Sequence, residues 1–353
     1  MAAKRAHMPR DEFAKAAAAA TAAGVVSVAG KVARDKVVRG KQRPRGYRLK
    51  DAEPVPEGVE RIALGRIDDA LDELRGKTDS SREEAIHEAR KNVKKLRALL
   101  RMVRGEIGDK AYRRENDAFR EIGRGLSGVR DADVMIETLD ALVERSPKGV
   151  PPEVAKGLMQ ALHAHRRGLE RDGAGGGPAK AIDALRAARE RVEEWPIAHD
   201  SFDALEPGLK RTYKRGRAAY RAALADPNTE NLHAWRRRVK DHWHHHTILE
   251  RSWPGVMEPI GDEAHALANL LGEDHDLAVL REWAWEHPQD AGDVPGLEAL
   301  ADAVGRRRAQ LQREALELGA RLYAERPSDF AQRLRLYWEA WRERPTPEQA
   351  ALG

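Results

Sequence analysis

The chain has 353 residues, and its 63 Lys and Arg exceed its 58 Asp and Glu by so little that net charge argues weakly for an anionic partner. Hydrophobic residues make up 41% and charged residues 34%, a balance typical of globular chains. The absence of cysteine excludes disulfides, cysteine-based zinc sites and thiol nucleophiles. Ala, Leu, Arg and Glu are abundant whereas Phe and Tyr are few, which predicts an all-α fold and disfavours all-β and Rossmann folds.

Residues 1–54 form a predicted N-terminal arm. Its uncharged segment, residues 16–30, is too short and too rich in alanine for a membrane span. Asp11 and Glu12 interrupt the basic start that a secretion signal needs, so we expect a cytoplasmic protein without a membrane partner. Residues 31–50 hold nine Lys or Arg and a single acid, a composition typical of a solvated or nucleic-acid-binding arm.

The rest of the chain shows helical patterns separated by segments rich in Gly and Pro, which together predict about a dozen helices. Residues 173–177 are mostly glycine but lack a following Lys-Ser or Lys-Thr pair, so they indicate a linker and not a phosphate loop. We expect two helical halves, residues 55–198 and 199–345, followed by a tail at 346–353.

An internal repeat relates the two halves. Both carry the pattern H-x-x-R-[K/R]-x-x-K, which comprises His87, Arg90, Lys91 and Lys94 in the first half and His233, Arg236, Arg237 and Lys240 in the second. Arg130-Asp131 follows 43 residues after His87, and His275-Asp276 follows 42 residues after His233. The spacing predicts an internal duplication with two pseudo-symmetric helical bundles.

The repeated motif places cations on one face of each helix, opposite an apolar face. The first stripe comprises His87, Arg90, Lys91, Lys94 and Arg101, and the second comprises His233, Arg236, Arg237, Lys240 and His244. A solvated face usually mixes signs, but residues 86–104 contain seven Lys or Arg and only Glu88 as an acid. Like charges one turn apart destabilise a helix, and a bound polyanion would remove that repulsion.

Two further stripes are weaker or occur only once. Residues 207–224 place Lys210, Lys214, Arg217 and Arg221 within about 60° of one another. The counterpart in the first half is acidic, with Asp68, Asp69, Asp72 and Glu73 beside Arg61 and Arg66. A fourth stripe comprises Lys156, His163, Arg166 and Arg167, which we interpret as a solvated face.

The segments IHEARKNVKKLRALLRMV and NLHAWRRRVKDHWHHHTIL resemble the two signature helices of the CHAD domain, the conserved-histidine α-helical domain. LKRTYKRGRAAYRAAL and LLGEDHDLAVL are also similar to its segments, and the resemblance covers about residues 55–345. It implies two helical bundles and the binding of inorganic polyphosphate on a basic surface that contains the histidines of both motifs.

Two enzyme-like alternatives rest on histidine. His242 and His246 have the i,i+4 spacing of helical metal ligands, but they fall on the packed side of their helix, so we expect core histidines and no metal. His275-Asp276 is similar to the pair in metal-dependent phosphohydrolases, but its first-half equivalent is Arg130-Asp131. We therefore interpret Asp131 and Asp276 as helix caps.

We expect a non-enzymatic, cytoplasmic protein without cofactors that binds inorganic polyphosphate and could associate with polyphosphate granules. The basic helices of both halves should line one shared cationic groove or pore. Its histidines should be neutral when free, so binding should tighten below about pH 6.5. Nucleic-acid binding through the basic arm and metal-dependent phosphohydrolysis remain the alternatives. The oligomeric state and the preferred chain length are not specified by the sequence.

Overall fold

The computed structural model describes residues 46–147, 149–171, 177–290 and 294–343. The predicted arm up to residue 45, most of the predicted linker and the tail at 346–353 lie outside these ranges. Within them the chain forms eleven α-helices and no strand. The predicted all-α fold is therefore confirmed.

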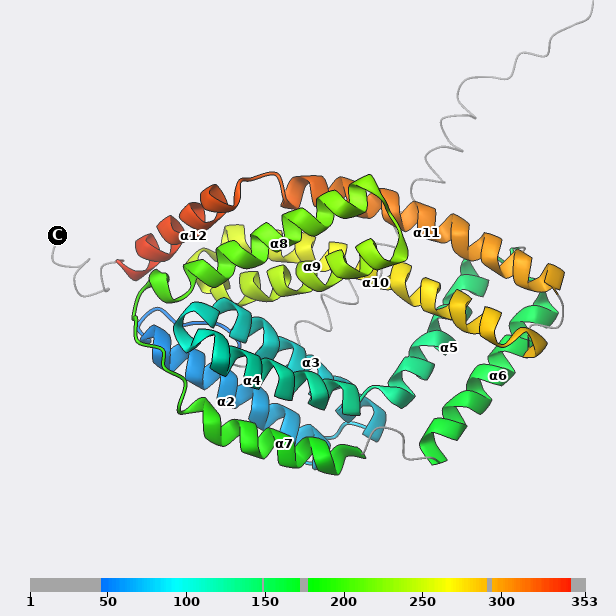
Figure 1. Cartoon of the computed structure of the whole chain (residues 1–353), viewed down its shortest axis with the longest axis horizontal. Helices are drawn as coiled ribbons and strands as arrows, with labels where there is room; N and C mark the ends of the chain where they lie inside the picture. The colour runs from blue at the N-terminus through cyan, green and yellow to red at the C-terminus, as the bar shows by residue number, and fades with distance from the viewer. Residues whose placement is uncertain (1–45, 148, 172–176, 291–293, 344–353) are drawn as a thin grey trace, which may run out of the picture. The chain divides into compact units, whose positions relative to one another are not determined.

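The helices follow one another with short connections (Figure 1). The first six are α2 (Val55–Leu74), α3 (Arg82–Met102), α4 (Arg104–Gly125), α5 (Gly128–Arg145), α6 (Pro152–Arg171) and α7 (Gly177–Val192). The other five are α8 (Glu206–Ala225), α9 (Thr229–Leu249), α10 (Pro254–Glu286), α11 (Val294–Leu322) and α12 (Pro327–Arg342).

The two helices with the repeated motif begin at side chains that satisfy free backbone N–H groups. Ser81 and Glu84 form a capping box at the start of α3, in which each side chain accepts a hydrogen bond from the other residue's backbone. Asn228 accepts a hydrogen bond from the backbone N–H of Asn231 at the start of α9. These caps fix where each cationic stripe begins.

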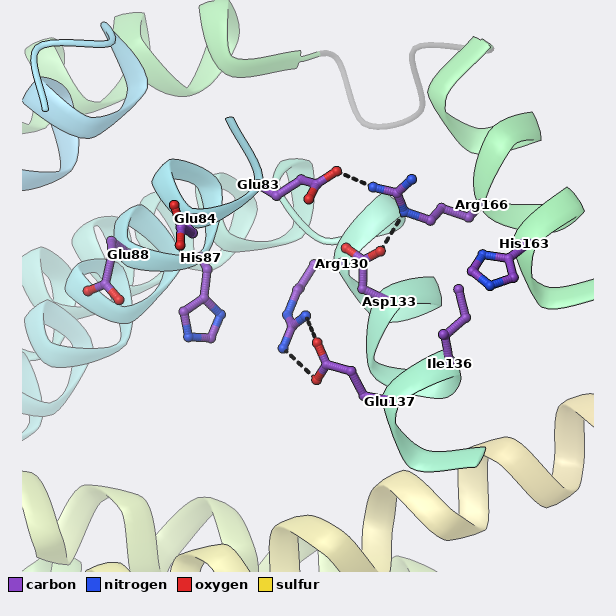
Figure 2. Close-up of a pocket in the computed structure, with 10 residues that line it drawn as sticks. All are labelled: Glu83, Glu84, His87, Glu88, Arg130, Asp133, Ile136, Glu137, His163 and Arg166. Atoms are coloured by element: carbon purple, nitrogen blue, oxygen red, sulfur yellow. Dashed lines mark hydrogen bonds and ion pairs between the residues drawn. The ribbon is translucent and has the colours of Figure 1, made fainter. Parts of the chain in front are cut away.

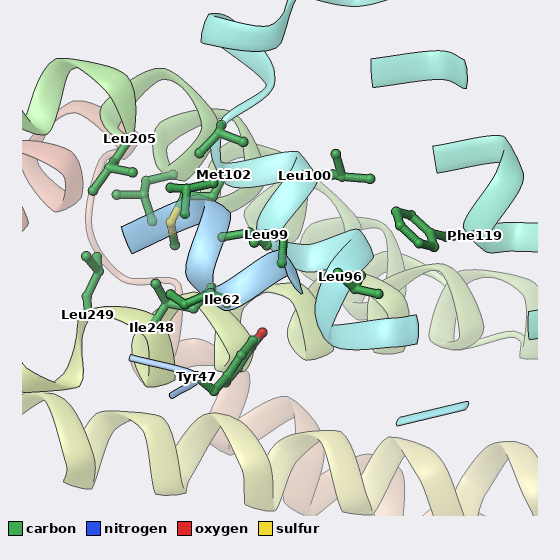
Figure 3. Packing of buried hydrophobic residues seen from close by; sticks show 14 of the residues in the cluster. Tyr47, Ile62, Leu96, Leu99, Leu100, Met102, Phe119, Leu205, Ile248 and Leu249 are labelled. Atoms are coloured by element: carbon green, nitrogen blue, oxygen red, sulfur yellow. The ribbon is translucent and has the colours of Figure 1, made fainter. Parts of the chain in front are cut away.

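The larger hydrophobic cluster joins helices of both predicted halves (Figure 3). Leu96 and Leu99 of α3 are fully buried in it, together with Ile248 of α9. Tyr47 and Leu49, which the sequence analysis places in the arm, also lie in this core, and the Leu49 N–H donates to the Ile248 carbonyl at 3.0 Å. Part of the predicted arm therefore belongs to the packed core.

A smaller hydrophobic cluster joins α5 and α6 to the C-terminal part of α10 and to α11. Its fully buried members include Leu139, Leu158, Leu280 and Leu300. Because each cluster draws on both halves of the sequence, the packing does not divide at residue 198, and the two-bundle organisation stays a prediction.

Helices α4 and α5 are separated at Leu126 and Ser127, whereas α10 continues unbroken for 33 residues. The prediction that Asp131 and Asp276 cap helices is therefore wrong. Ser127 holds the N-cap position of α5, and Asp276 lies in the interior of α10. Asp131 still lies in the first turn of α5, where a negative charge interacts favourably with the helix dipole.

None of the described helices combines the length and the apolar composition that crossing a bilayer requires.

Candidate functional site

The cationic stripes of α3 and α9 meet. Lys94 of α3 lies close enough to Arg236 of α9 for their charges to interact, and Lys240 interacts in the same way with Lys94 and Arg90. We call Arg90, Lys94, Arg236 and Lys240 the central cluster. The structure thus brings together equivalent positions of the two predicted motifs.

Mutual repulsion and burial affect both lysines of the central cluster. Burial, together with the charges of Arg90 and Arg236, lowers the pKa of Lys94 to about 8. Burial, together with Arg236 and Lys94, lowers the pKa of Lys240 to about 7. Lys240 is half-buried, but the Lys94 side chain reaches solvent although protein atoms surround it. Because the Lys94 side chain is exposed, an anion in solution can reach it.

Both arginines of the central cluster have a carboxylate neighbour on another helix. Arg90 Nη2 lies 3.3 Å from Asp131 Oδ1 of α5, and Arg236 Nη2 lies 3.9 Å from Asp276 Oδ1 of α10. The same pairing therefore occurs on both sides of the cluster, at the positions that the sequence repeat makes equivalent.

The sequence shows few acids beside the stripe cations, so we expect cations without carboxylate partners. That expectation is wrong for these two arginines and for two further residues. Lys91 Nζ lies 2.7 Å from Glu88 Oε1, and Arg101 Nη1 lies 3.2 Å from Asp241 Oδ1 at the far end of α3. Most of these acids lie on a different helix from the cation. The residue spacing within a single helix therefore cannot predict these ion pairs. Within the described residues, Lys94, Arg237 and Lys240 form no ion pair.

Three histidines, His87, His233 and His275, border the central cluster. The rings of His233 and His275 lie 4.3 Å apart, and within the described residues the buried Nδ1 atom of each has no hydrogen-bond partner. Burial and the charge of Lys91 lower the pKa of His87 to about 4, and burial and Arg236 lower that of His275 to about 4. Burial and Arg237 also lower the pKa of His233. These rings are therefore neutral at pH 7.

A recess of about 460 Å³ opens beside His87, between the start of α3 and the helices α5 and α6. Figure 2 shows that its arginines are already engaged by acids. Arg130 Nη1 lies 2.7 Å from Glu137 Oε1, and Arg166 Nε lies 2.6 Å from Asp133 Oδ1. Because its positive charges are matched, this recess adds little attraction for an anion.

Lys95 of α3 is a further cation beside the stripe that the predicted stripes do not include. Its ammonium lies 5.6 Å from the centre of the Tyr47 ring, and burial together with Arg66 lowers its pKa to about 7. His244, a predicted site residue, is buried nearby, with its ring centre 6.0 Å from that of Tyr47. Tyr47 lies outside the helical pattern, so its contact with Lys95 could not be predicted from residue spacing. The only sign of Lys95 in the sequence is that it directly follows Lys94.

The predicted stripe on α8 does not join the central cluster. Arg217 Nε donates to the Tyr323 carbonyl at 3.1 Å, where α8 meets the end of α11. Lys210, Lys214 and Arg221 are exposed. Within the described residues, no hydrogen bond or ion pair joins them to the central cluster.

The pair formed by His242 and His246 lies in the core, on the side that the sequence predicts. Both side chains are buried, with rings 4.6 Å apart and packed against Tyr213 and Phe330. The described residues contain no group of three or more His, Asp or Glu side chains that is arranged to hold a metal ion. The absence of a bound metal stays a prediction.

The fold and this site describe an all-α protein in which cations from two repeated helices form one group. The sequence matches the family model of the CHAD domain over residues 62–285, which is more than half of the chain. The protein therefore belongs to the CHAD domain family, which is associated with proteins of polyphosphate and triphosphate biology. No curated protein matches the chain.

Proposed function

We propose that the protein binds inorganic polyphosphate at the central cluster and performs no chemistry on it. The observation that carries this proposal is the meeting of Arg90, Lys94, Arg236 and Lys240 at one place, with no ion-pair partner for the two lysines within the described residues. Polyphosphate has about one negative charge per phosphate and no bases, so its recognition needs cations at regular spacing and no base readout.

The residue types support a flexible phosphate chain as the ligand. Arginine binds phosphate oxygens through two parallel N–H groups, whereas lysine acts as a point charge that tolerates different positions of the chain. The cluster contains two of each. Phosphate would compete with Asp131 and Asp276 for the arginines, and it would restore the full charge of Lys94 and Lys240 by raising their pKa values.

Competition between long-chain polyphosphate and DNA of equal charge, at equal salt, tests this proposal. We expect polyphosphate to bind more tightly. The variant with Arg90, Lys94, Arg236 and Lys240 all changed to Glu should lose at least about a hundredfold in affinity, since charged hydrogen bonds contribute about 1.5–3 kcal/mol each. Its salt dependence should also fall by about 0.7 per lost phosphate contact.

A matched control changes four ion-paired surface cations, Lys77, Arg120, Arg124 and Arg186, to Glu. This variant has the same net charge as the first but keeps the central cluster, so its affinity should stay close to that of the wild type. An equal loss in both variants would show that binding depends on net charge alone. Tighter binding of DNA would favour a nucleic-acid function, and phosphate release with Mn²⁺ or Zn²⁺ would favour a phosphohydrolase.

A further inference from the structure

Helix α8 carries a second group of cations outside the central cluster. Its exposed members are Lys210, Arg211, Lys214, Arg215 and Arg221, which we call the α8 face. The one acid of this helix is Glu206 in its first turn, where it pairs with Arg335 of α12. No residue of the α8 face forms an ion pair within the described residues.

Helix α9 separates the α8 face from the central cluster. Trp235 and His242 of α9 pack against Tyr220 and Tyr213 of α8, with ring centres 5.3 and 5.5 Å apart. The Arg236 side chain of α9 instead reaches Asp276 of α10, at 3.9 Å. One side of α9 therefore holds α8, and a different side carries the central cluster.

On α8 itself, the packed residues and the cations also take different sides. At 100° per residue, the α8 face lies about 90–170° from the direction of Leu209, Tyr213, Gly216 and Tyr220. With helix axes 8–10 Å apart and helix diameters of about 10 Å, the two cationic surfaces lie roughly 20 Å from each other. This is about twice the distance over which physiological salt screens charges, so a short anion at one surface does not reach the other. Arg238 of α9 lies between the two, since its charge interacts with both Arg215 and Arg237.

The lack of acid partners distinguishes α8 from other basic helices of the protein. On α4, Arg120 lies 3.1 Å from Asp117, and Arg124 lies 3.1 Å from Glu121. On α7, Arg186 lies 3.2 Å from Asp183. Those helices pair several of their exposed cations with their own acids, whereas none of the α8 face has such a partner within the described residues.

We propose that the α8 face is a second polyphosphate-binding surface, so that one molecule holds two polyphosphate segments on different sides of α9 and links them. This inference rests on the proposed function. The exposed cations of α8 have no exposed aromatic residue between them, since Tyr213 is buried and Tyr220 packs against Trp235. Single-stranded nucleic acids usually need such rings for stacking, so the α8 face fits a chain of phosphates without bases.

Light scattering on mixtures of the protein with long-chain polyphosphate tests the linking. The wild type should form large assemblies near charge equivalence, because each molecule connects two segments. The variant Lys210→Gln, Lys214→Gln, Arg221→Gln should bind polyphosphate without forming assemblies, and its salt slope should be smaller by about 2. The control Arg120→Gln, Arg124→Gln, Arg186→Gln, with the same net charge, should assemble like the wild type.

A fluorescence measurement with labelled tripolyphosphate, which is too short to reach both surfaces, gives a second test. We expect two bound per wild-type molecule and one per molecule of the α8 variant. If wild-type protein binds no polyphosphate at all, the proposed function fails. If it binds but the α8 variant assembles and binds tripolyphosphate like the control, the second surface is refuted and the first stands.

Discussion

The two sides of the central cluster use equivalent motifs but differ in how far their charges are matched. On the α3 side, Arg90 lies 3.3 Å from Asp131, Lys91 lies 2.7 Å from Glu88, and the adjoining recess is lined with acids. On the α9 side, Arg236 lies 3.9 Å from Asp276, and Lys240 has no ion-pair partner within the described residues.

The helices that precede each motif differ in the same direction. Helix α2 carries Asp68, Asp69 and Asp72, whereas α8 carries the unmatched α8 face. The repeated motif thus sets where cations lie, while neighbouring residues decide how many of them remain available. We infer that the second half contributes more of the affinity for an anion.

Charge-reversal variants on each side of the central cluster should differ in how much polyphosphate affinity they lose. Changing Arg236 and Lys240 to Glu should weaken polyphosphate binding by about a hundredfold or more, because Arg236 has only a long contact with Asp276, Lys240 has no ion-pair partner within the described residues, and both become anions. Changing Arg90 and Lys94 to Glu should weaken it by about tenfold, because Arg90 already gives part of its hydrogen bonding to Asp131. Isothermal calorimetry at fixed salt measures both. Equal losses would show that the two sides contribute alike.

Two buried histidines of α9 should make the folded protein less stable in acid. At the positions equivalent to His245 and His246, α3 has the aliphatic residues Leu99 and Leu100. Burial lowers the pKa of His245 to about 4 and that of His246 to about 3, so the unfolded state binds more protons below pH 6.5. Stability should therefore fall as pH drops from about 6.5 to 4, by roughly 3 kcal/mol for each histidine.

The variant His246→Leu, which copies Leu100 of α3, isolates this contribution. Neither ring nitrogen of His246 has a hydrogen-bond partner within the described residues, so its removal leaves no new polar group unsatisfied. The variant should be at least as stable as the wild type at pH 7 and should lose less stability toward pH 5. Urea unfolding at both pH values checks this, and an unchanged slope with pH would contradict it.

A third prediction follows from the lysines of the central cluster. Their pKa values of about 8 for Lys94 and about 7 for Lys240 rise when an anion binds, so the complex holds more protons than the free protein. Affinity should therefore fall at least about tenfold between pH 7 and pH 9. The histidines, with pKa values of about 4 for His87 and His275, should add a further gain below about pH 6.5.

Replacing Lys240 with Arg tests the lysine contribution, because arginine keeps its charge throughout this range. The variant should show a flatter decline in affinity above pH 7. Calorimetry in two buffers with different heats of ionisation measures the proton uptake itself. Uptake that is the same for the variant and the wild type would assign the linkage to other groups.

The smallest expected effect comes from the acids beside the arginines. Changing Asp276 to Asn should tighten polyphosphate binding several-fold, since the acid is partly buried and competes with phosphate for Arg236. Changing Asp131 to Asn should have less effect, because its side chain is 60% exposed and its charge is more strongly screened. Asp140→Asn, on the same helix as Asp131, provides a control with an equal charge change. Weaker binding in either variant would mean that the acid orients its arginine for the ligand.

Periodicity alone predicted much of this molecule. The all-α fold, the opposite faces of α3 and the burial of His242 and His246 follow from residue spacing, because helical geometry repeats over every turn. The spacing also predicted that both motifs contribute to one place. Arg90 and Arg236 are in fact close to the same two lysines.

Other features depend on contacts between distant residues, which spacing does not encode. Asp241 neutralises Arg101 from another helix, and Tyr47 reaches the core from a segment with the composition of a solvated arm. The α8 cations were expected in the shared groove because their number and phase were right. Only the packing of α8 on α9 shows that they face elsewhere.

The break between α4 and α5 has a mechanical consequence for the central cluster. Arg90 Nη1 donates to the carbonyls of Leu126 and Ser127 at this break, at 3.4 and 3.3 Å, and so clamps the joint between the two helices. An anion that draws Arg90 away would remove these hydrogen bonds and make the connection between α4 and α5 more flexible. On the other side of the cluster, α10 is one continuous helix and is expected to stay rigid. We therefore expect any widening around a bound chain to come from swinging of α5, with α10 held still.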